Sequence, residues 1–83
     1  MWRVYVPKSA QKAIARVPAA DASRIMAAIR QMAVDPFAGD IRQLEARTYR
    51  RRVGAYRIIF EVNTDFRAVQ ILRVERRTST TYR

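Results

Sequence analysis

The residues best suited to do chemistry lie in segment 49–57, where four arginines fall within the nine positions YRRRVGAYR. A guanidinium group stays protonated at neutral pH and presents a planar fork of donors that matches phosphate oxygens. The segment runs directly into positions 58–62, IIFEV, whose β-branched and aromatic residues favour a strand. Arginines held on a strand, rather than in a free tail, indicate a surface that binds a polyanion such as nucleic acid.

The overall charge agrees with this interpretation. The chain has 17 Lys and Arg against 7 Asp and Glu, a net charge of +10 in 83 residues. An excess of this size predicts a polyanionic partner and binding that weakens with salt. Hydrophobic residues make up 49% of the sequence, which favours a folded protein over a disordered basic chain. The length predicts one small domain spanning 1–83.

The residue inventory limits the chemistry that this surface can perform. The chain has no His and no Cys, which excludes a histidine acid–base pair and a cysteine nucleophile. Its few carboxylates lack the spacing of a metal site, so we expect no metal and no other cofactor. Stabilisation of negative charge in a transition state is the main effect that arginines can supply. The lack of Cys, of a signal-like N-terminus and of a long apolar run favours a cytoplasmic protein with no membrane partner.

The first half of the chain predicts one strand and two helices. Positions 1–6 alternate apolar and polar residues, as in a short strand. Ser9 is the expected N-cap of a first helix, Pro18 interrupts it, and a second helix runs from about position 20 to Asp35-Pro36. The apolar positions at helical spacing are Ala10, Ala13, Ile14 and Val17 in the first helix and Ala22, Ile25, Ile29 and Met32 in the second.

The second half predicts three strands, at 48–53, 56–63 and 67–75, joined by turns at 54–55 and 63–66. Segment 41–47 has no clear assignment. The resulting order is β-α-α-β-β-β. This order predicts an α+β fold in which a helical hairpin packs on one face of a mostly antiparallel four-stranded sheet.

Alternation along the strands separates the arginines by face. If Tyr56 and Ile58 point toward the helices, Arg57 lies on the open face of the sheet, and Arg50 and Arg52 join it across the hairpin. The same alternation puts Arg51 on the helix-facing side, which the pattern does not explain. The other arginines are expected at solvated positions, and Trp2 and Phe37 in the core or an interface. These solvated arginines are Arg3, Arg16, Arg24, Arg30 and Arg42.

Three stretches together resemble a known family. They are Arg16-Val17-Pro18 with the helix that ends at Asp35-Pro36, the segment 49–62, and the segment 71–77 (ILRVERR) with Tyr82 beyond it. In this order and spacing the chain resembles the RelE/ParE superfamily of toxins from type II toxin–antitoxin modules, and more closely its RelE branch. The resemblance spans nearly the whole chain.

The resemblance implies a function. Members of the RelE branch are ribosome-dependent endoribonucleases that cut mRNA in the A site and so inhibit translation. It implies attack of a ribose 2′-hydroxyl on the adjacent phosphate without a metal ion. It also implies three partners: the ribosome, mRNA and a cognate antitoxin protein.

The same resemblance implies roles for individual residues. Arg57 would steady the phosphate, and Arg50 occupies the position of a catalytic lysine. Arg76 would lie near the leaving group, and Tyr82 would stack on the nucleotide or deprotonate it. The residues assigned to further RNA contacts are Arg52, Arg73 and Arg77.

Several positions depart from the RelE pattern and keep other functions open. Thr48 replaces a second basic residue, and Glu75 places a negative charge beside Arg76. The first alternative is a ParE-like inhibitor of DNA gyrase that cleaves nothing, and the second is an inactive relative that only binds its antitoxin. For Arg57 itself, the structural alternative is a cross-strand ion pair with Glu61 or Glu75.

Overall fold

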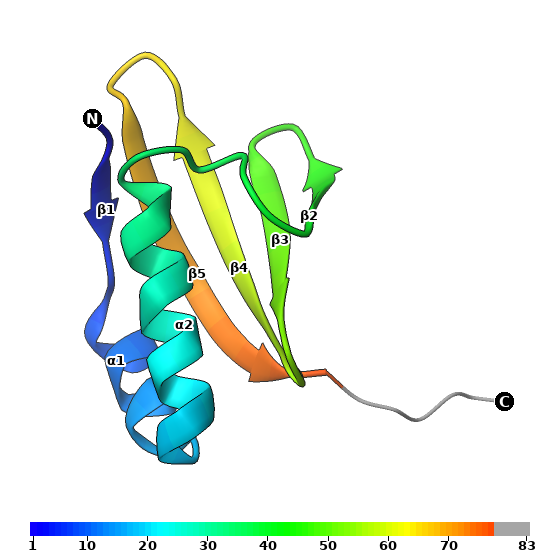
Figure 1. The fold of residues 1–83 in the computed structure, drawn as a ribbon. Helices are drawn as coiled ribbons and strands as arrows, with labels where there is room; N and C mark the ends of the chain where they lie inside the picture. Colours follow the sequence, from blue (N-terminus) through cyan, green and yellow to red (C-terminus); the bar gives the residue numbers. More distant parts are fainter. Residues whose placement is uncertain (78–83) are drawn as a thin grey trace, which may run out of the picture.

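A computed structural model describes residues 1–77 and shows two helices lying against one face of a twisted sheet (Figure 1). The helices are α1 (Lys8–Ala15) and α2 (Ala19–Met32). The strands are β1 (Arg3–Tyr5), β2 (Ile41–Glu45), β3 (Thr48–Val53), β4 (Tyr56–Asn63) and β5 (Ala68–Arg76).

The sheet has the strand order β1-β5-β4-β3-β2. Strands β2 to β5 pair antiparallel with their neighbours, whereas β1 pairs parallel with β5. The predicted α+β fold, its helical hairpin and its strands are confirmed. The predicted sheet of four strands in fact has five, because β2 forms an edge strand in the segment left unassigned above.

Helix α1 begins differently from the prediction, whereas α2 begins close to the predicted position 20. Helix α1 begins at Lys8, one residue before the predicted cap, so Ser9 is not the N-cap. The carbonyl of Pro7 accepts the first helical hydrogen bond, from the Gln11 amide at 3.0 Å. Proline suits a position just outside a helix, because its missing N–H would have no helical partner there. Helix α2 follows Pro18 in the same way.

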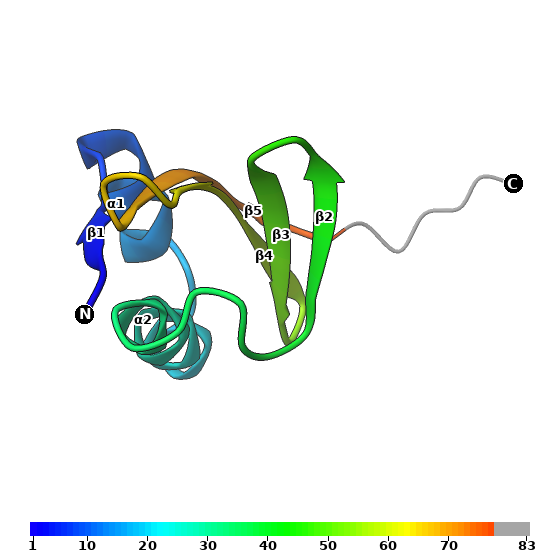
Figure 2. The ribbon, with the colours of Figure 1, turned by 90° about the horizontal axis from the view of Figure 1, so that it is seen from above.

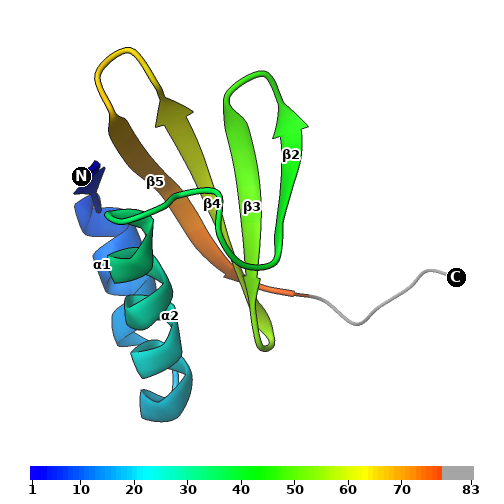
Figure 3. The same cartoon turned by 45° about the horizontal axis from the view of Figure 1, so that its top comes forward.

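The main core lies between the helices and the sheet. Both predicted helical stripes face this core, with Ile25 and Met32 completely buried. The central strands β4 and β5 supply the opposite wall, where Phe60 and Ile71 are also completely buried. Figures 2 and 3 show β2 at the side of the sheet away from the helices. Because both helices pack against the core-facing side of the sheet, the opposite face of β2 to β5 carries no helix.

A row of aromatic rings extends this core toward the α2–β2 connection. Phe37 packs edge-on against Trp2 and Tyr49, at centroid distances of 6.1 and 5.5 Å, and Tyr49 stacks on Phe60 at 5.8 Å. The guanidinium of Arg67 lies 4.7 Å from the centre of the Trp2 ring. The expectation that Trp2 and Phe37 serve packing is consistent with these contacts.

The structure explains the helix-facing position of Arg51. Its Nη2 donates a hydrogen bond to Oε1 of Gln31 near the end of α2, at 2.7 Å. The side chain passes over Gly39, which has a φ of +87°, and a Cβ atom added to Gly39 would lie 2.5 Å from Cζ of Arg51. Arg51 thus fastens β3 to α2 and to the α2–β2 connection, and this contact requires glycine at position 39.

Candidate functional site

The strand register gathers basic side chains on the open face of the sheet. Arg52 of β3 lies directly opposite Arg57 of β4, and Arg50 lies opposite Ile59. Residues that face each other across antiparallel strands share one side of the sheet, so Arg50, Arg52 and Arg57 share the open face as predicted. They line a groove of about 460 Å³, which we call the open-face groove. Its lining residues are Arg42, Gln43, Leu44, Arg50, Arg52, Arg57, Ile59, Arg73 and Glu75.

An isoleucine lies among these charged side chains. Ile59 is only 3% exposed, although it does not belong to the core beneath the helices. Its cross-strand partners are Arg50 on one side and Arg73 on the other. Long arginine side chains bury their aliphatic stems while their charged ends stay in water. The arginines therefore both cover Ile59 and present their guanidinium groups to the groove.

The groove is strongly positive. Within residues 1–77, five arginines and one glutamate line it, which gives this lining a charge of +4. Like charges directly opposite one another on paired strands repel, and Arg52 and Arg57 are such a pair. A bound anion would relieve this repulsion, so the groove is electrostatically suited to phosphate groups.

Glu75 is the one carboxylate of the described residues that lines the groove. Its Oε2 accepts a hydrogen bond from Nε of Arg57 at 2.7 Å, and its Oε1 accepts one from Nε of Arg73 at 3.0 Å. Partial burial alone would raise the pKa of Glu75, but the hydrogen bonds and charges of Arg57 and Arg73 outweigh it and hold the pKa below its usual value. The cross-strand pair of Arg57 with Glu75, considered above as an alternative, is present.

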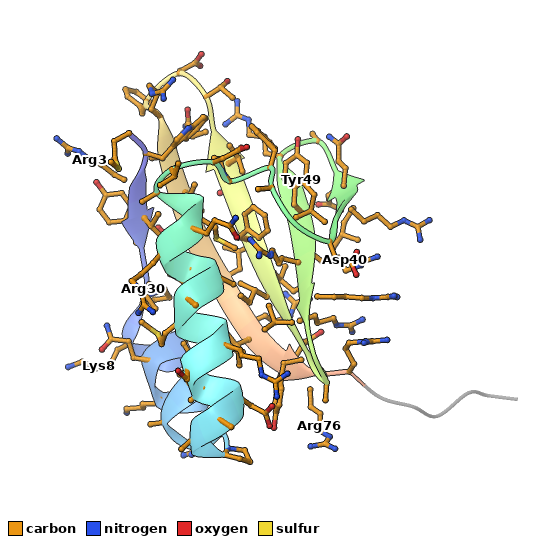
Figure 4. All side chains as sticks on the ribbon, in the orientation of Figure 1. Arg3, Lys8, Arg30, Asp40, Tyr49 and Arg76 are labelled. Carbon is orange, nitrogen blue, oxygen red and sulfur yellow. The ribbon has the colours of Figure 1, made fainter. Side chains whose placement is uncertain are left out.

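Arg50 is the most enclosed arginine of the groove. Its side chain is 11% exposed, and its Nη1 lies 3.5 Å from Oδ1 of Asp40. Asp40 belongs to the α2–β2 connection and is itself mostly exposed (Figure 4). Part of the Arg50 charge is therefore already balanced by a carboxylate at the rim.

Arg76 does not lie with the other predicted site residues. It is the cross-strand partner of Tyr56, which is buried on the helix-facing side. Its guanidinium lies 5.8 Å from the centre of the Tyr56 ring, at the end of the sheet shown in Figure 4. The expected grouping of Arg76 with Arg50 and Arg57 is not found, because Arg76 and the groove lie on opposite faces.

The remaining predicted site residues do not all lie in the groove. Arg73 lines the groove. Arg77 instead binds the β3–β4 turn: its Nη1 donates to the carbonyl of Gly54 at 2.9 Å, and its amide donates to that of Ala55 at 2.7 Å. Tyr82 lies outside the described residues.

Arg42 is a groove residue that the sequence interpretation missed. The sequence predicts a solvated surface for Arg42, but on β2 this residue lies opposite Arg50. Only the pairing of 41–45 with β3, which the structure shows, places Arg42 on the same face as Arg50. A register shift between Gln43 and Glu45 interrupts that strand and obscures its alternation.

Within residues 1–77, no helix is long and apolar enough to cross a membrane. The same residues contain no group of three or more His, Cys, Asp or Glu side chains placed to hold a metal ion. The chemistry of the described site therefore rests on arginine, with a single glutamate.

Comparison with known families assigns this chain, with helices on one face of its sheet and an arginine-lined groove on the other, to a class of toxin. Residues 4–80 match the family model described as the ParE toxin of the type II toxin–antitoxin system parDE. The chain therefore belongs to this family, within the RelE/ParE toxin superfamily. Comparison with curated proteins gives no match.

Solved structures with the same fold are mostly RelE toxins. The chain is 28% identical to the toxin in the archaeal RelE–RelB complex from Pyrococcus horikoshii OT3, with a TM-score of 0.88 over 95% of this chain and 98% of that one. It is also 28% identical to the toxin in the RelB–RelE antitoxin–toxin complex from Methanococcus jannaschii, with a TM-score of 0.71 over 86% and 87%. The isolated E. coli RelE toxin shares the fold at 11% identity, with a TM-score of 0.81 over 96% and 88%.

Proposed function

We propose that this toxin is a ribosome-dependent endoribonuclease that cleaves mRNA in the A site and thereby inhibits translation. The observation that carries the proposal is the open-face groove, where Arg57 lies between Arg52 on β3 and Glu75 on β5. The likeness of the chain to two archaeal RelE toxins, each at 28% identity, supports the same assignment.

The groove suits a reaction in which a ribose 2′-hydroxyl attacks the adjacent phosphate without a metal ion. Negative charge grows on the phosphate oxygens in the transition state, and fixed guanidinium groups stabilise it. Arg57 and Arg73 have side chains that are 41% and 59% exposed and can reach a phosphate. Arg50 supplies charge from the groove wall. In this proposal Arg73, rather than Arg76, contacts the phosphate beside Arg57.

Proton transfer requires another group, because arginine stays protonated and is a poor proton shuttle. Tyr82 remains the predicted base or stacking ring, and the ribosome supplies orientation of the mRNA. Substitution of Tyr82 by Phe separates the two roles. Slower single-turnover cleavage supports proton transfer, whereas an unchanged rate leaves only stacking.

We propose a cognate antitoxin as the protein partner, since the P. horikoshii and M. jannaschii toxins were each crystallised with RelB. An acidic or amphipathic segment fits the surfaces available: it would wrap the helices and cover or distort the basic face. Ribosomes and mRNA are the proposed targets, and the cytoplasm is the proposed location.

The test is to induce the protein and map the 5′ ends of mRNA on translating ribosomes. We expect cuts at a fixed position within A-site codons. Loss of a charge-stabilising donor costs about 10²- to 10³-fold in rate, so Arg57→Ala should abolish detectable cutting. Arg30→Ala on the exposed surface of α2 is the matched control and should cut normally. Intact mRNA with the wild-type protein would reject the proposal.

A second candidate is inhibition of DNA gyrase without nuclease activity. The description of the matched family as the toxin of parDE favours it, as does the partial neutralisation of Arg57 by Glu75. The same induction experiment separates the two, because this candidate predicts gyrase-dependent DNA breaks while mRNA stays intact.

A further inference from the structure

We propose that Glu75 is a positioning residue that holds Arg57 and Arg73 as a pair able to grip one phosphodiester group of the RNA. We call these three side chains the Glu75 clamp. The proposal rests on the proposed function, because it assumes that the open-face groove binds RNA. From the sequence alone, Glu75 only reduces the positive charge of the basic surface. In this proposal its carboxylate also orients the arginines that bind RNA.

The strand register builds the clamp. Glu75 is the cross-strand partner of Arg57, and Arg73 lies two residues earlier on β5, so all three side chains share the open face. The two carboxylate oxygens are divided between the arginines: Oε2 accepts from Arg57 and Oε1 accepts from Arg73. A single carboxylate thus fixes two guanidinium groups side by side.

The atoms used in these contacts leave the outer ends of both arginines available. Each hydrogen bond to Glu75 comes from Nε, the guanidinium nitrogen nearest the backbone. In residues 1–77, no hydrogen bond involves the terminal nitrogens of Arg57 or Arg73. The terminal nitrogens carry most of the donors of each guanidinium, and a phosphodiester has two unshared oxygens to accept from them.

Removing the carboxylate would loosen this arrangement. Arg57 and Arg73 would then repel each other, and each flexible side chain would regain rotamer freedom that RNA binding must restrict again. Because its two arginine partners lower the pKa of Glu75, the carboxylate stays ionised at neutral pH and is a weak base. The chemistry of Glu75 therefore fits orientation rather than proton abstraction.

Glu75→Gln separates orientation from charge, since the two effects act in opposite directions. The substitution removes one negative charge, which strengthens attraction of RNA, and it also releases the two arginines, which slows the reaction. Glu61→Gln is the matched control. Glu61 lies exposed on the same face of β4, and its cross-strand partners are Thr48 and Gln70 rather than arginines.

The first measurement does not depend on cleavage. The Nε–H signals of Arg57 and Arg73 are followed by NMR in the free protein and during titration with a 2′-O-methyl RNA hexanucleotide, which cannot be cut. We expect distinct signals that shift together with RNA in the wild type and in Glu61→Gln. In Glu75→Gln both free signals should collapse toward those of unbonded arginines. Unchanged signals in Glu75→Gln would overturn the proposal.

The second measurement is single-turnover cleavage on translating ribosomes together with affinity for the uncleavable hexanucleotide. Misplaced groups cost up to about a hundredfold in rate, so Glu75→Gln should cleave ten- to a hundredfold more slowly while binding the RNA at least as tightly. Glu75→Asp should recover part of the rate, and Glu61→Gln should keep all of it. Faster cleavage by Glu75→Gln would make Glu75 an inhibitory counter-ion instead.

The two proposals fail in different ways. If the wild-type protein cleaves nothing, the nuclease function is rejected, and the NMR titration alone decides the clamp. If the wild type cleaves and Glu75→Gln matches its rate, the nuclease function stands and the clamp is rejected.

Discussion

Substitution of Gly39 by Ala tests the contact that fastens the arginine-bearing strand to the helices. Gly39 has a φ of +87°, and an added Cβ would lie 2.5 Å from Cζ and 2.6 Å from Nε of Arg51. Both atoms belong to a guanidinium that is held by Gln31 and enclosed by its surroundings. The Arg51 side chain must therefore move, and its hydrogen bond to Gln31 must lengthen or break.

The expected loss of stability has two parts. An L-residue other than Gly in a left-handed conformation costs roughly 1–2 kcal/mol. Loss of a hydrogen bond to a charged group costs a further ~1.5–3 kcal/mol. The total of about 2.5–5 kcal/mol corresponds to a fall in Tm of roughly 10–40 °C for a domain of this size.

Gly54→Ala provides the matched control. Gly54 also has a positive φ, of +58°, but an added Cβ would meet only Nη1 of Arg24, at an ordinary 3.7 Å. It should lose only the backbone part, about 1–2 kcal/mol. The effect of Ala on the unfolded chain is similar at both sites and cancels in the comparison.

Urea unfolding followed by circular dichroism measures both variants. Equal losses for Gly39→Ala and Gly54→Ala would refute the clash with Arg51. The double variant Gly39→Ala/Arg51→Ala gives a second check, because the cost of Gly39→Ala should shrink when Arg51 is already absent. Full additivity of the two single changes would contradict the proposed coupling.

Three further outcomes follow from the structure. Arg42→Ala should lower the slope of log affinity for single-stranded RNA against log salt by about 0.7, whereas Arg30→Ala should leave it unchanged. Salt titrations followed by fluorescence anisotropy measure these slopes. Equal slopes for Arg42→Ala and the wild type would show that Arg42 does not contact the RNA backbone. Because Arg57 and Arg73 lower the pKa of Glu75, its ionised form stabilises the fold above the usual carboxyl pKa, and this stability is lost as pH falls through the folded pKa. The difference in unfolding free energy between wild type and Glu75→Gln should therefore be constant near neutral pH and vanish in acid; a difference that persists in urea unfolding at low pH would contradict the ion pair. Arg67→Ala should cost about 0.5–1 kcal/mol through its lost contact with Trp2, and thermal unfolding should show no such cost in a Trp2→Leu background.

The strands that carry the groove were predictable because their patterns are local. Strand β4 alternates between the buried Ile58, Phe60 and Val62 and the open-face Arg57, and Gly54 marks the hairpin before it. Alternation was therefore enough to place Arg50, Arg52 and Arg57 on one face. The helices were equally clear, since their apolar stripes match the buried positions.

The features that were missed depend on contacts between distant segments. Strand β2 is short, polar and interrupted by a register shift, so nothing local distinguishes it from a loop. The role of Arg51 depends on Gly39 and Gln31, which no periodicity connects to β3. Arg76 is a different case: counting from the buried Val74 assigns it to the helix-facing side, whereas positional resemblance alone placed it in the groove.

Among residues 1–77, the lining of the open-face groove comes from the stretch 42–75 alone, and neither helix contributes a side chain to it. Successive side chains of β3 and β4 point to opposite faces, so the sheet separates the helix-covered surface from the groove. Substitutions on the outer surfaces of α1 and α2 can therefore change the helical face without changing the residues that line the groove. The helix surfaces and the groove of this chain can thus change in sequence independently of each other.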